Sequence, residues 1–177
     1  MIVNKIYIVC IFFAMISLIS CKNRNKTDEN NPQIVVNDEM FATANKEAVR
    51  KENIQIDDFI RRYKWEMTTS NTGVRYQIYE HGRGVKTKKG DIVTLDYTIT
   101  FLNGDTVYSS KTDGNKEFMI DKSNEVSGLE EALLLMNQGD RAKLIVPSFR
   151  AYGITGDFNK ISVKNTLVYD VHLLRVN

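Results

Sequence analysis

The sequence predicts an α+β fold in which a curved antiparallel sheet wraps across one short central helix. The helix is indicated between residues 126 and 139 by apolar residues spaced three and four positions apart. The sheet is indicated by alternating apolar and polar residues, most clearly in residues 92–101 and 165–174. We expect this domain to occupy residues 73–177, after an N-terminal helical segment and a flexible, lipid-anchored linker.

The central helix has a recognisable start and end. Ser127 followed by Glu130 is a capping-box pair, so we expect the helix to cover residues 127–138. Gly139 supplies the left-handed residue that ends many helices. One apolar stripe should face the sheet, and it consists of Leu129, Ala132, Leu133 and Met136.

Five stretches have the pattern of strands, namely residues 73–80, 92–101, 106–110, 141–146 and 165–174. The pair Asn103-Gly104 separates the second and third stretches and is typical of a hairpin turn. Pro147 should end the fourth strand because proline cannot donate to the ladder. These strands should place Tyr97 and Tyr169 on the inner face of the sheet.

Residues 1–20 have the layout of a secretory signal: Lys5, an apolar run, and then Leu-Ile-Ser before Cys21. The ending resembles a bacterial lipobox, in which the signal is cleaved and Cys21 becomes the lipidated N-terminus. The alternative is an uncleaved anchor helix with an incidental cysteine. In the lipobox reading only the lipid touches the membrane, and the protein is held in the cell envelope, at the outer membrane.

Residues 21–44 should form a flexible linker, because most of this stretch is polar and too poor in apolar residues to fold by itself. Residues 45–72 have a helical pattern. They form either one broken helix or two short helices, and in the second case Asp57 would cap the second helix. The apolar face around Phe59 and Trp65 either packs back on the domain or serves as an arm that binds a partner or a second copy.

The composition argues against several classes of function. With 24 basic and 22 acidic residues, the formal charge of +2 gives no support for nucleic-acid binding. The two cysteines, Cys10 and Cys21, lie in or beside the signal, and the two histidines are far apart in the sequence. The sequence therefore predicts no metal site, no cofactor and no nucleophile of the usual kinds.

Several motifs resemble the FKBP-type peptidyl-prolyl isomerases. They are the VSGLEE start of the central helix, the GDRAKLIVP run, Ala151-Tyr152-Gly153, the hairpin GDIVTLDYTITFLNGDTVYSS and the last strand NTLVYDVHLL. Together they cover most of the chain from Gly73 onward. More loosely, the lipobox, the N-terminal helix and Tyr108 resemble the gliding-motility-associated isomerase lipoproteins of Bacteroidetes-like bacteria.

The resemblance implies cis/trans isomerisation of X-Pro bonds during folding of exported or envelope proteins. Proline-containing polypeptides would be the substrates, bound in an apolar aromatic cup. The catalytic residues would be Tyr97, Tyr152 and Tyr169, with the Tyr152 hydroxyl and the Val126 backbone N–H contacting substrate. The remaining substrate-binding residues would be Val107, Tyr108, Phe118, Val126, Leu129 and Ile161.

The chain departs from the family pattern at the cup. Val107-Tyr108 stands where the family usually has Phe-Asp, so an aromatic wall and a buried carboxylate are lost, and Leu129 stands where tryptophan is common. The segment 111–118 is short, so Phe118 replaces either the pocket phenylalanine of the family or a neighbouring core residue. The alternative function is a weak or inactive binding or chaperone domain within an envelope or motility assembly.

Overall fold

The computed structural model describes residues 38–177, so the predicted signal, Cys21 and the first part of the linker lie outside the described residues. Seven strands form one antiparallel sheet in the order β1-β2-β6-β7-β3-β4, and β5 shares the edge of β3 with β4. The strands are β1 (Thr68–Thr69), β2 (Arg75–Glu80), β3 (Ile92–Thr100), β4 (Thr106–Ser109), β5 (Lys116–Met119), β6 (Arg141–Val146) and β7 (Leu167–Val176). The helices are α2 (Asp38–Tyr63), α3 (Ser110–Asp113), α4 (Ser127–Leu133) and the 3-10 turn η1 (Ser148–Arg150).

The centre of the sheet is β7, which pairs with β3 on one side and with β6 on the other. The predicted alternation is confirmed here, because Leu167, Tyr169 and Val171 are almost fully buried. The hairpin between β3 and β4 is also confirmed, and Gly104 adopts a φ of 95° in its turn. The predicted α+β architecture is therefore correct.

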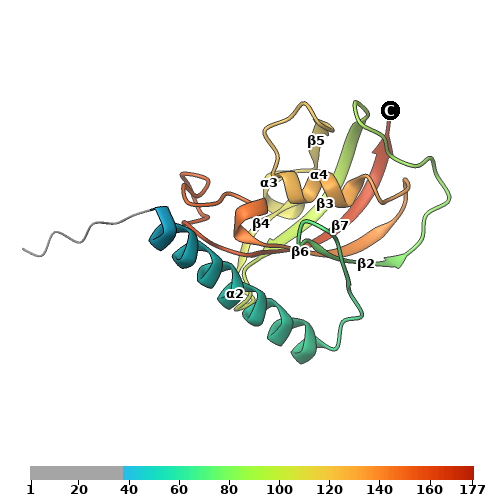
Figure 1. Ribbon diagram of the computed structural model, residues 1–177. Helices are drawn as coiled ribbons and strands as arrows, with labels where there is room; N and C mark the ends of the chain where they lie inside the picture. The colour runs from blue at the N-terminus through green and yellow to red at the C-terminus, as the bar shows by residue number, and fades with distance from the viewer. Residues whose placement is uncertain (1–37) are drawn as a thin grey trace, which may run out of the picture. The chain divides into compact units, whose positions relative to one another are not determined.

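Helix α4 lies across one face of the sheet (Figure 1), and it approaches β6 closely. A Cβ atom added at Gly128 would come within 2.5 Å of Val146 Cγ1, so only glycine permits this contact. The predicted capping box is wrong. Val126 is the N-cap, the Ser127 hydroxyl donates to the Arg150 carbonyl at 3.2 Å, and Glu130 accepts from the Ser123 hydroxyl at 2.7 Å. These partners from other loops replace the local ones.

Helix α4 is also shorter than the predicted 127–138, because it ends at Leu133. Beyond it, the chain turns with tighter bonds, such as Met136 N–H to the Leu133 carbonyl at 2.9 Å. The Thr87 hydroxyl, which is buried, donates to the Met136 carbonyl at 3.0 Å and to the Leu133 carbonyl. A side chain from a distant loop therefore satisfies carbonyls at the end of the helix.

Helix α2 is a single helix that begins at Asp38, within the predicted linker and seven residues before the predicted helical segment. Asp38 and Glu39 occupy its first turn, where negative charge is favourable. Asp57 caps no second segment and instead accepts from Arg75 at 3.4 Å. The helix ends at Tyr63, where Lys64 takes a φ of 54° and Trp65 N–H bonds to the Ile60 carbonyl at 3.1 Å.

The apolar face of α2 packs on the face of the sheet opposite to α4 (Figure 1). Ile56 and Phe59 are buried against Ile145 of β6 and Val168 of β7. Trp65 adds an edge contact to Phe59, with ring centroids 5.3 Å apart. The sheet is thus covered on both faces, which explains why Ile145 is buried although strand alternation turns it away from the α4 side.

None of the helices within residues 38–177 combines the length and the apolar character that a membrane span requires.

The docking of α2 makes a testable prediction about stability. Ile56→Ala should lower the free energy of unfolding by about 2–4 kcal/mol, because Ile56 is fully buried between α2 and the sheet. Ile54→Ala is the matched control, since the same substitution on the same helix affects a side chain that is 46% exposed and should cost less than about 0.5 kcal/mol. Urea titration followed by the fluorescence of Trp65 measures both. Equal losses would show that α2 does not dock as described.

Candidate functional site

Tyr97 and Tyr169 stand on neighbouring strands and face the same side of the sheet. In the register of β3 and β7, Tyr97 lies opposite Val171 and Tyr169 lies opposite Ile99, so the two tyrosines are diagonal neighbours. Tyr97 is 7% exposed and Tyr169 is 1% exposed. Burial raises the pKa of Tyr169 well above its usual range, and the nearby Tyr152, Glu125 and Tyr97 add to the effect.

Tyr152 reaches the same place from the loop that follows β6. The turn η1 starts at Ser148, and the Gly153 N–H closes the loop by donating to the Ser148 carbonyl at 2.8 Å. Burial, with the negative charges of Glu125 and Asp157 adding to it, raises the pKa of Tyr152 to about 12. The Tyr152 hydroxyl is therefore protonated at neutral pH and able to donate a hydrogen bond.

The apolar residues of the predicted site lie in the same hydrophobic core as these tyrosines. Val126 and Leu129 come from the start of α4, Val107 from β4, and Ile161 from the loop before β7. All four are less than 8% exposed and belong to one hydrophobic cluster with Tyr97 and Tyr169. The half-buried Tyr108, Phe118 and Tyr152 pack against this cluster. We call these nine predicted residues the tyrosine cluster.

Tyr108 has a carboxylate partner that the sequence analysis did not foresee. Its hydroxyl donates to Asp157, whose other oxygen accepts from the backbone N–H groups of Asn159 at 2.9 Å and Ile161 at 2.7 Å. Burial alone would raise the pKa of Asp157, but these hydrogen bonds outweigh it and lower that pKa. Asp157 thus places a carboxylate beside Tyr108, the position at which the family usually has an aspartate. The Asp-x-Asn pattern of a side-chain-capped turn is the local signal that could have indicated it.

An ion pair beside the cluster was also missed. Lys116 Nζ lies 2.7 Å from Glu125 Oε1, and both side chains are less than a quarter exposed. Lys116 Nζ also lies 5.4 Å from the centroid of the Tyr97 ring. The other carboxylate oxygen of Glu125 and the Tyr169 hydroxyl are buried and have no hydrogen-bond partner within residues 38–177. Nothing local in the sequence brings Lys116 to Glu125, so only the fold could reveal the pair.

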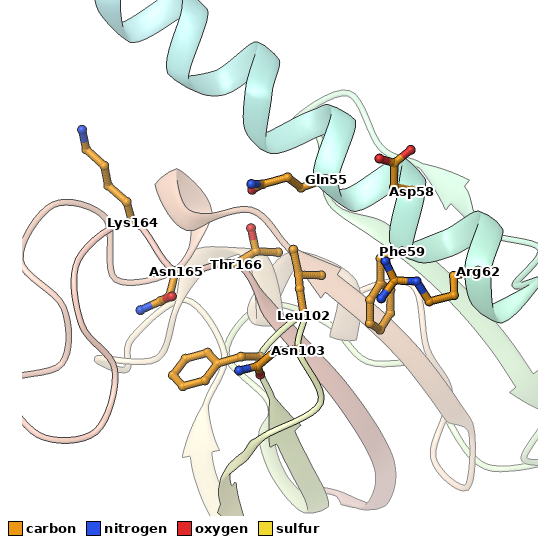
Figure 2. Close-up of a pocket in the computed structure, with 10 residues that line it drawn as sticks. Gln55, Asp58, Phe59, Arg62, Leu102, Asn103, Lys164, Asn165 and Thr166 are labelled. Carbon is orange, nitrogen blue, oxygen red and sulfur yellow. The ribbon is translucent and has the colours of Figure 1, made fainter.

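A cavity of about 530 Å³ lies elsewhere, between α2, the β3–β4 turn and the segment that precedes β7 (Figure 2). Phe59, which lines it, packs on the α2 side of the sheet, and none of the nine predicted site residues is part of its lining. Asp58, Arg62 and Lys164 make much of the lining charged. The predicted site residues therefore lie apart from this cavity.

Chemically, the tyrosine cluster combines apolar side chains with protonated tyrosine hydroxyls, and the Lys116–Glu125 pair and Asp157 lie beside it. Such a surface removes a polar amide from water while leaving a donor for its carbonyl oxygen. It needs no nucleophile and no titrating base near neutral pH. The arrangement fits a reaction in which a bond rotates and no covalent bond is made or broken.

The similarity of this chain to known proteins covers the regions that carry the candidate site. Residues 84–174 match the family model of FKBP-type peptidyl-prolyl cis-trans isomerase. The chain is 35% identical over 105 residues to outer membrane protein MIP of Legionella longbeachae, covering 59% of this chain and 45% of MIP. It is 39% identical over 106 residues to FK506-binding protein 2 of Dictyostelium discoideum, covering 59% of this chain and 78% of that protein. The crystal structure of FkpA from Escherichia coli superposes with a TM-score of 0.64 at 32% identity, covering 78% of this chain and 64% of that one.

The chain thus spans about half the length of MIP and somewhat under two-thirds of the FkpA chain. The narrower likeness to gliding-motility lipoproteins stays a prediction. The family match covers just over half of this chain and includes β3, α4, β6, the Tyr152 loop and most of β7. This protein belongs to the FKBP-type peptidyl-prolyl cis-trans isomerases.

Proposed function

We propose that this protein accelerates cis/trans isomerisation of X-Pro bonds, and that the tyrosine cluster binds the proline. The observation that carries the proposal is that Tyr97 and Tyr152 lie near enough to Tyr169 to raise its pKa, and that all three belong to or pack against the core that contains Val126 and Leu129. The family to which the chain belongs supports the reaction class. The substrates are proline-containing polypeptides, in keeping with a site that lacks a recognition feature for a small charged ligand.

The mechanism follows from the origin of the barrier. Rotation about a peptide bond is opposed by roughly 18–20 kcal/mol of amide resonance, which water strengthens by hydrogen bonding to the planar, polar form. Moving the X-Pro bond onto Leu129 and Val126 removes that water. The Tyr152 hydroxyl then donates to the carbonyl oxygen as it rotates, which favours the twisted state over the planar one.

The unpartnered groups of the site support this reading. The Tyr169 hydroxyl and one Glu125 oxygen are buried without a hydrogen bond within residues 38–177, so these two polar atoms beside the cluster are free of competing partners there. The Tyr108–Asp157 bond supports the wall formed by Ile161, whose backbone N–H also bonds to Asp157. The site therefore keeps its shape without the family's Phe-Asp pair.

The cellular role we propose is assistance to the folding of exported proteins in the cell envelope. Outer membrane protein MIP, a relative over the isomerase region, carries an envelope location in its name. The lipobox that ends at Cys21 supplies a means of attachment, with residues 22–37 as the tether. The tether would let the domain sample unfolded chains near the membrane surface.

Removing the Tyr152 hydroxyl should slow catalysis without unfolding the protein. Tyr152→Phe keeps the ring and deletes one hydrogen bond, so kcat/KM should fall by about fivefold, equivalent to about 1 kcal/mol. The measurement is proline-limited refolding of a substrate protein, a process of tens of seconds when uncatalysed. Tyr79→Phe is the control, because the Tyr79 hydroxyl bonds to Asp170 at 2.8 Å outside the cluster. No acceleration by wild-type protein on several X-Pro sequences would refute the proposed reaction.

The raised pKa of Tyr152 predicts a pH profile. A pKa of about 12 keeps the donor protonated in alkaline solution, whereas an ordinary tyrosine, with a pKa near 10, would begin to lose its proton about two pH units earlier. The ratio of wild-type to Tyr152→Phe activity should therefore stay constant from pH 7 to about 10. Using the ratio cancels every effect of pH that the two proteins share. A ratio that falls towards one near pH 9–10 would show that the hydroxyl titrates normally.

The lipobox predicts the chemical state of the N-terminus. Protein purified from membranes of a bacterium with a lipoprotein pathway should begin at Cys21 and carry acyl chains, as mass spectrometry of the N-terminal peptide would show. Cys21→Ser should abolish the lipid mass and release the protein from the membrane fraction. Recovery of unmodified wild-type protein with Met1 intact would contradict this prediction.

A further inference from the structure

Glu52, in the middle of α2, holds the start of the loop that carries Tyr152. One carboxylate oxygen accepts from the Ser148 backbone N–H at 2.6 Å, and the other accepts from the Ser148 hydroxyl at 3.0 Å. Ser148 is 8% exposed, so water does not readily replace these bonds. The contact joins residues that are 96 positions apart in the sequence.

Ser148 in turn sets the path of the loop. Its carbonyl accepts from the Ala151 N–H at 3.1 Å and from the Gly153 N–H at 2.8 Å, the residues on either side of Tyr152. A shift of Ser148 therefore moves both backbone anchors of Tyr152. The Gly153 carbonyl also accepts from the Lys164 N–H at 2.7 Å, so the loop is bonded to the segment that precedes β7.

The same carboxylate reaches the entrance of β7. Glu52 Oε1 also accepts from the Thr166 hydroxyl at 2.5 Å, and Thr166 is 6% exposed. Thr166 lies three residues before Tyr169, directly before the first residue of β7. Glu52 thus joins α2 to the two segments that carry Tyr152 and Tyr169.

Both oxygens of Glu52 take part in this contact. Oε1 accepts from the Ser148 N–H and the Thr166 hydroxyl, and Oε2 accepts from the Ser148 hydroxyl. A glutamine would keep one oxygen for the first two donors, and the Ser148 hydroxyl, which accepts as well as donates, would turn to its NH2 group. Alanine at this position removes all three bonds.

We propose that Glu52 is a positioning residue for the isomerase, acting through Tyr152, so that α2 is part of the catalytic unit and does more than cover the sheet. This inference rests on the proposed function for its effect on rate. Glu52 touches neither the tyrosine cluster nor the substrate, and its influence passes through Ser148 and the loop.

The test compares Glu52→Ala with Asn53→Ala in otherwise full-length protein. Asn53 is the matched control because it accepts from Arg75 at 2.9 Å, which ties the same helix to β2 without touching the Tyr152 loop. Glu52→Ala should lower kcat/KM by up to about fivefold, the limit set by losing the Tyr152 hydrogen bond itself. Asn53→Ala should leave kcat/KM within about twofold of wild type. Urea titration of both variants separates this effect from loss of stability.

A double mutant shows whether Glu52 acts through Tyr152. In the Tyr152→Phe background, Glu52→Ala should cost less than a further factor of about two, because the hydroxyl that Glu52 positions is already gone. A structural role alone would give the same fold-loss in both backgrounds. Full additivity of the two losses would overturn the proposal.

Hydrogen exchange provides a readout that does not depend on activity. Exchange of the Gly153 and Lys164 amides should accelerate by about tenfold in Glu52→Ala and remain unchanged in Asn53→Ala. If wild-type protein shows no isomerase activity, the proposed function fails, and the exchange result alone decides whether Glu52 positions the loop. Unchanged exchange at Gly153 in Glu52→Ala would overturn the proposal whatever the activity.

Discussion

The structure depends on the pairing of β7 with a strand on each of its edges. Because successive side chains of a strand point to opposite faces, β7 contributes Leu167, Tyr169 and Val171 to one hydrophobic layer and Val168 to the other. A register slip of one residue would expose Tyr169 to the α2 side and bury polar groups beneath α4. The position of the tyrosine cluster is therefore fixed by the same ladder of hydrogen bonds that holds the sheet together.

The site illustrates how one structural role can move between segments. At the position where the family pattern has an aspartate the chain has Tyr108, and the carboxylate comes from Asp157, which bonds both the Tyr108 hydroxyl and the backbone at Ile161. The replacement orders a loop as well as supplying charge, since Asp157 accepts backbone bonds within that loop. A bond rotation demands only a dry surface of the right shape and a donor, so the reaction tolerates such an exchange better than acid–base chemistry would.

Sequence reasoning succeeded where a pattern is local and failed where partners are distant. Alternation predicted the inward faces of β3 and β7, because burial on one face imposes a period of two. The capping box at Ser127 was wrong, because Ser127 and Glu130 found partners at Arg150 and Ser123 that no short pattern describes. The pairing of Lys116 with Glu125 was invisible for the same reason. The start of α2 at Asp38 was not predicted, because residues 38–44 follow a polar stretch and carry no helical apolar spacing of their own.

The two layers of the sheet are joined by polar contacts as well as by packing, and this links α2 to the chemistry. Burial of Ile56 and Phe59 fixes the helix on the sheet, but apolar contacts are non-directional and would tolerate small shifts. The hydrogen bonds from Ser148 and Thr166 to Glu52 are directional. They therefore hold the Tyr152 loop and the start of β7 at fixed positions relative to the helix. A domain cut off before β1 would keep every residue of the tyrosine cluster and lose this constraint. The contacts that order the Tyr152 loop therefore begin in α2, upstream of the region that the family match covers.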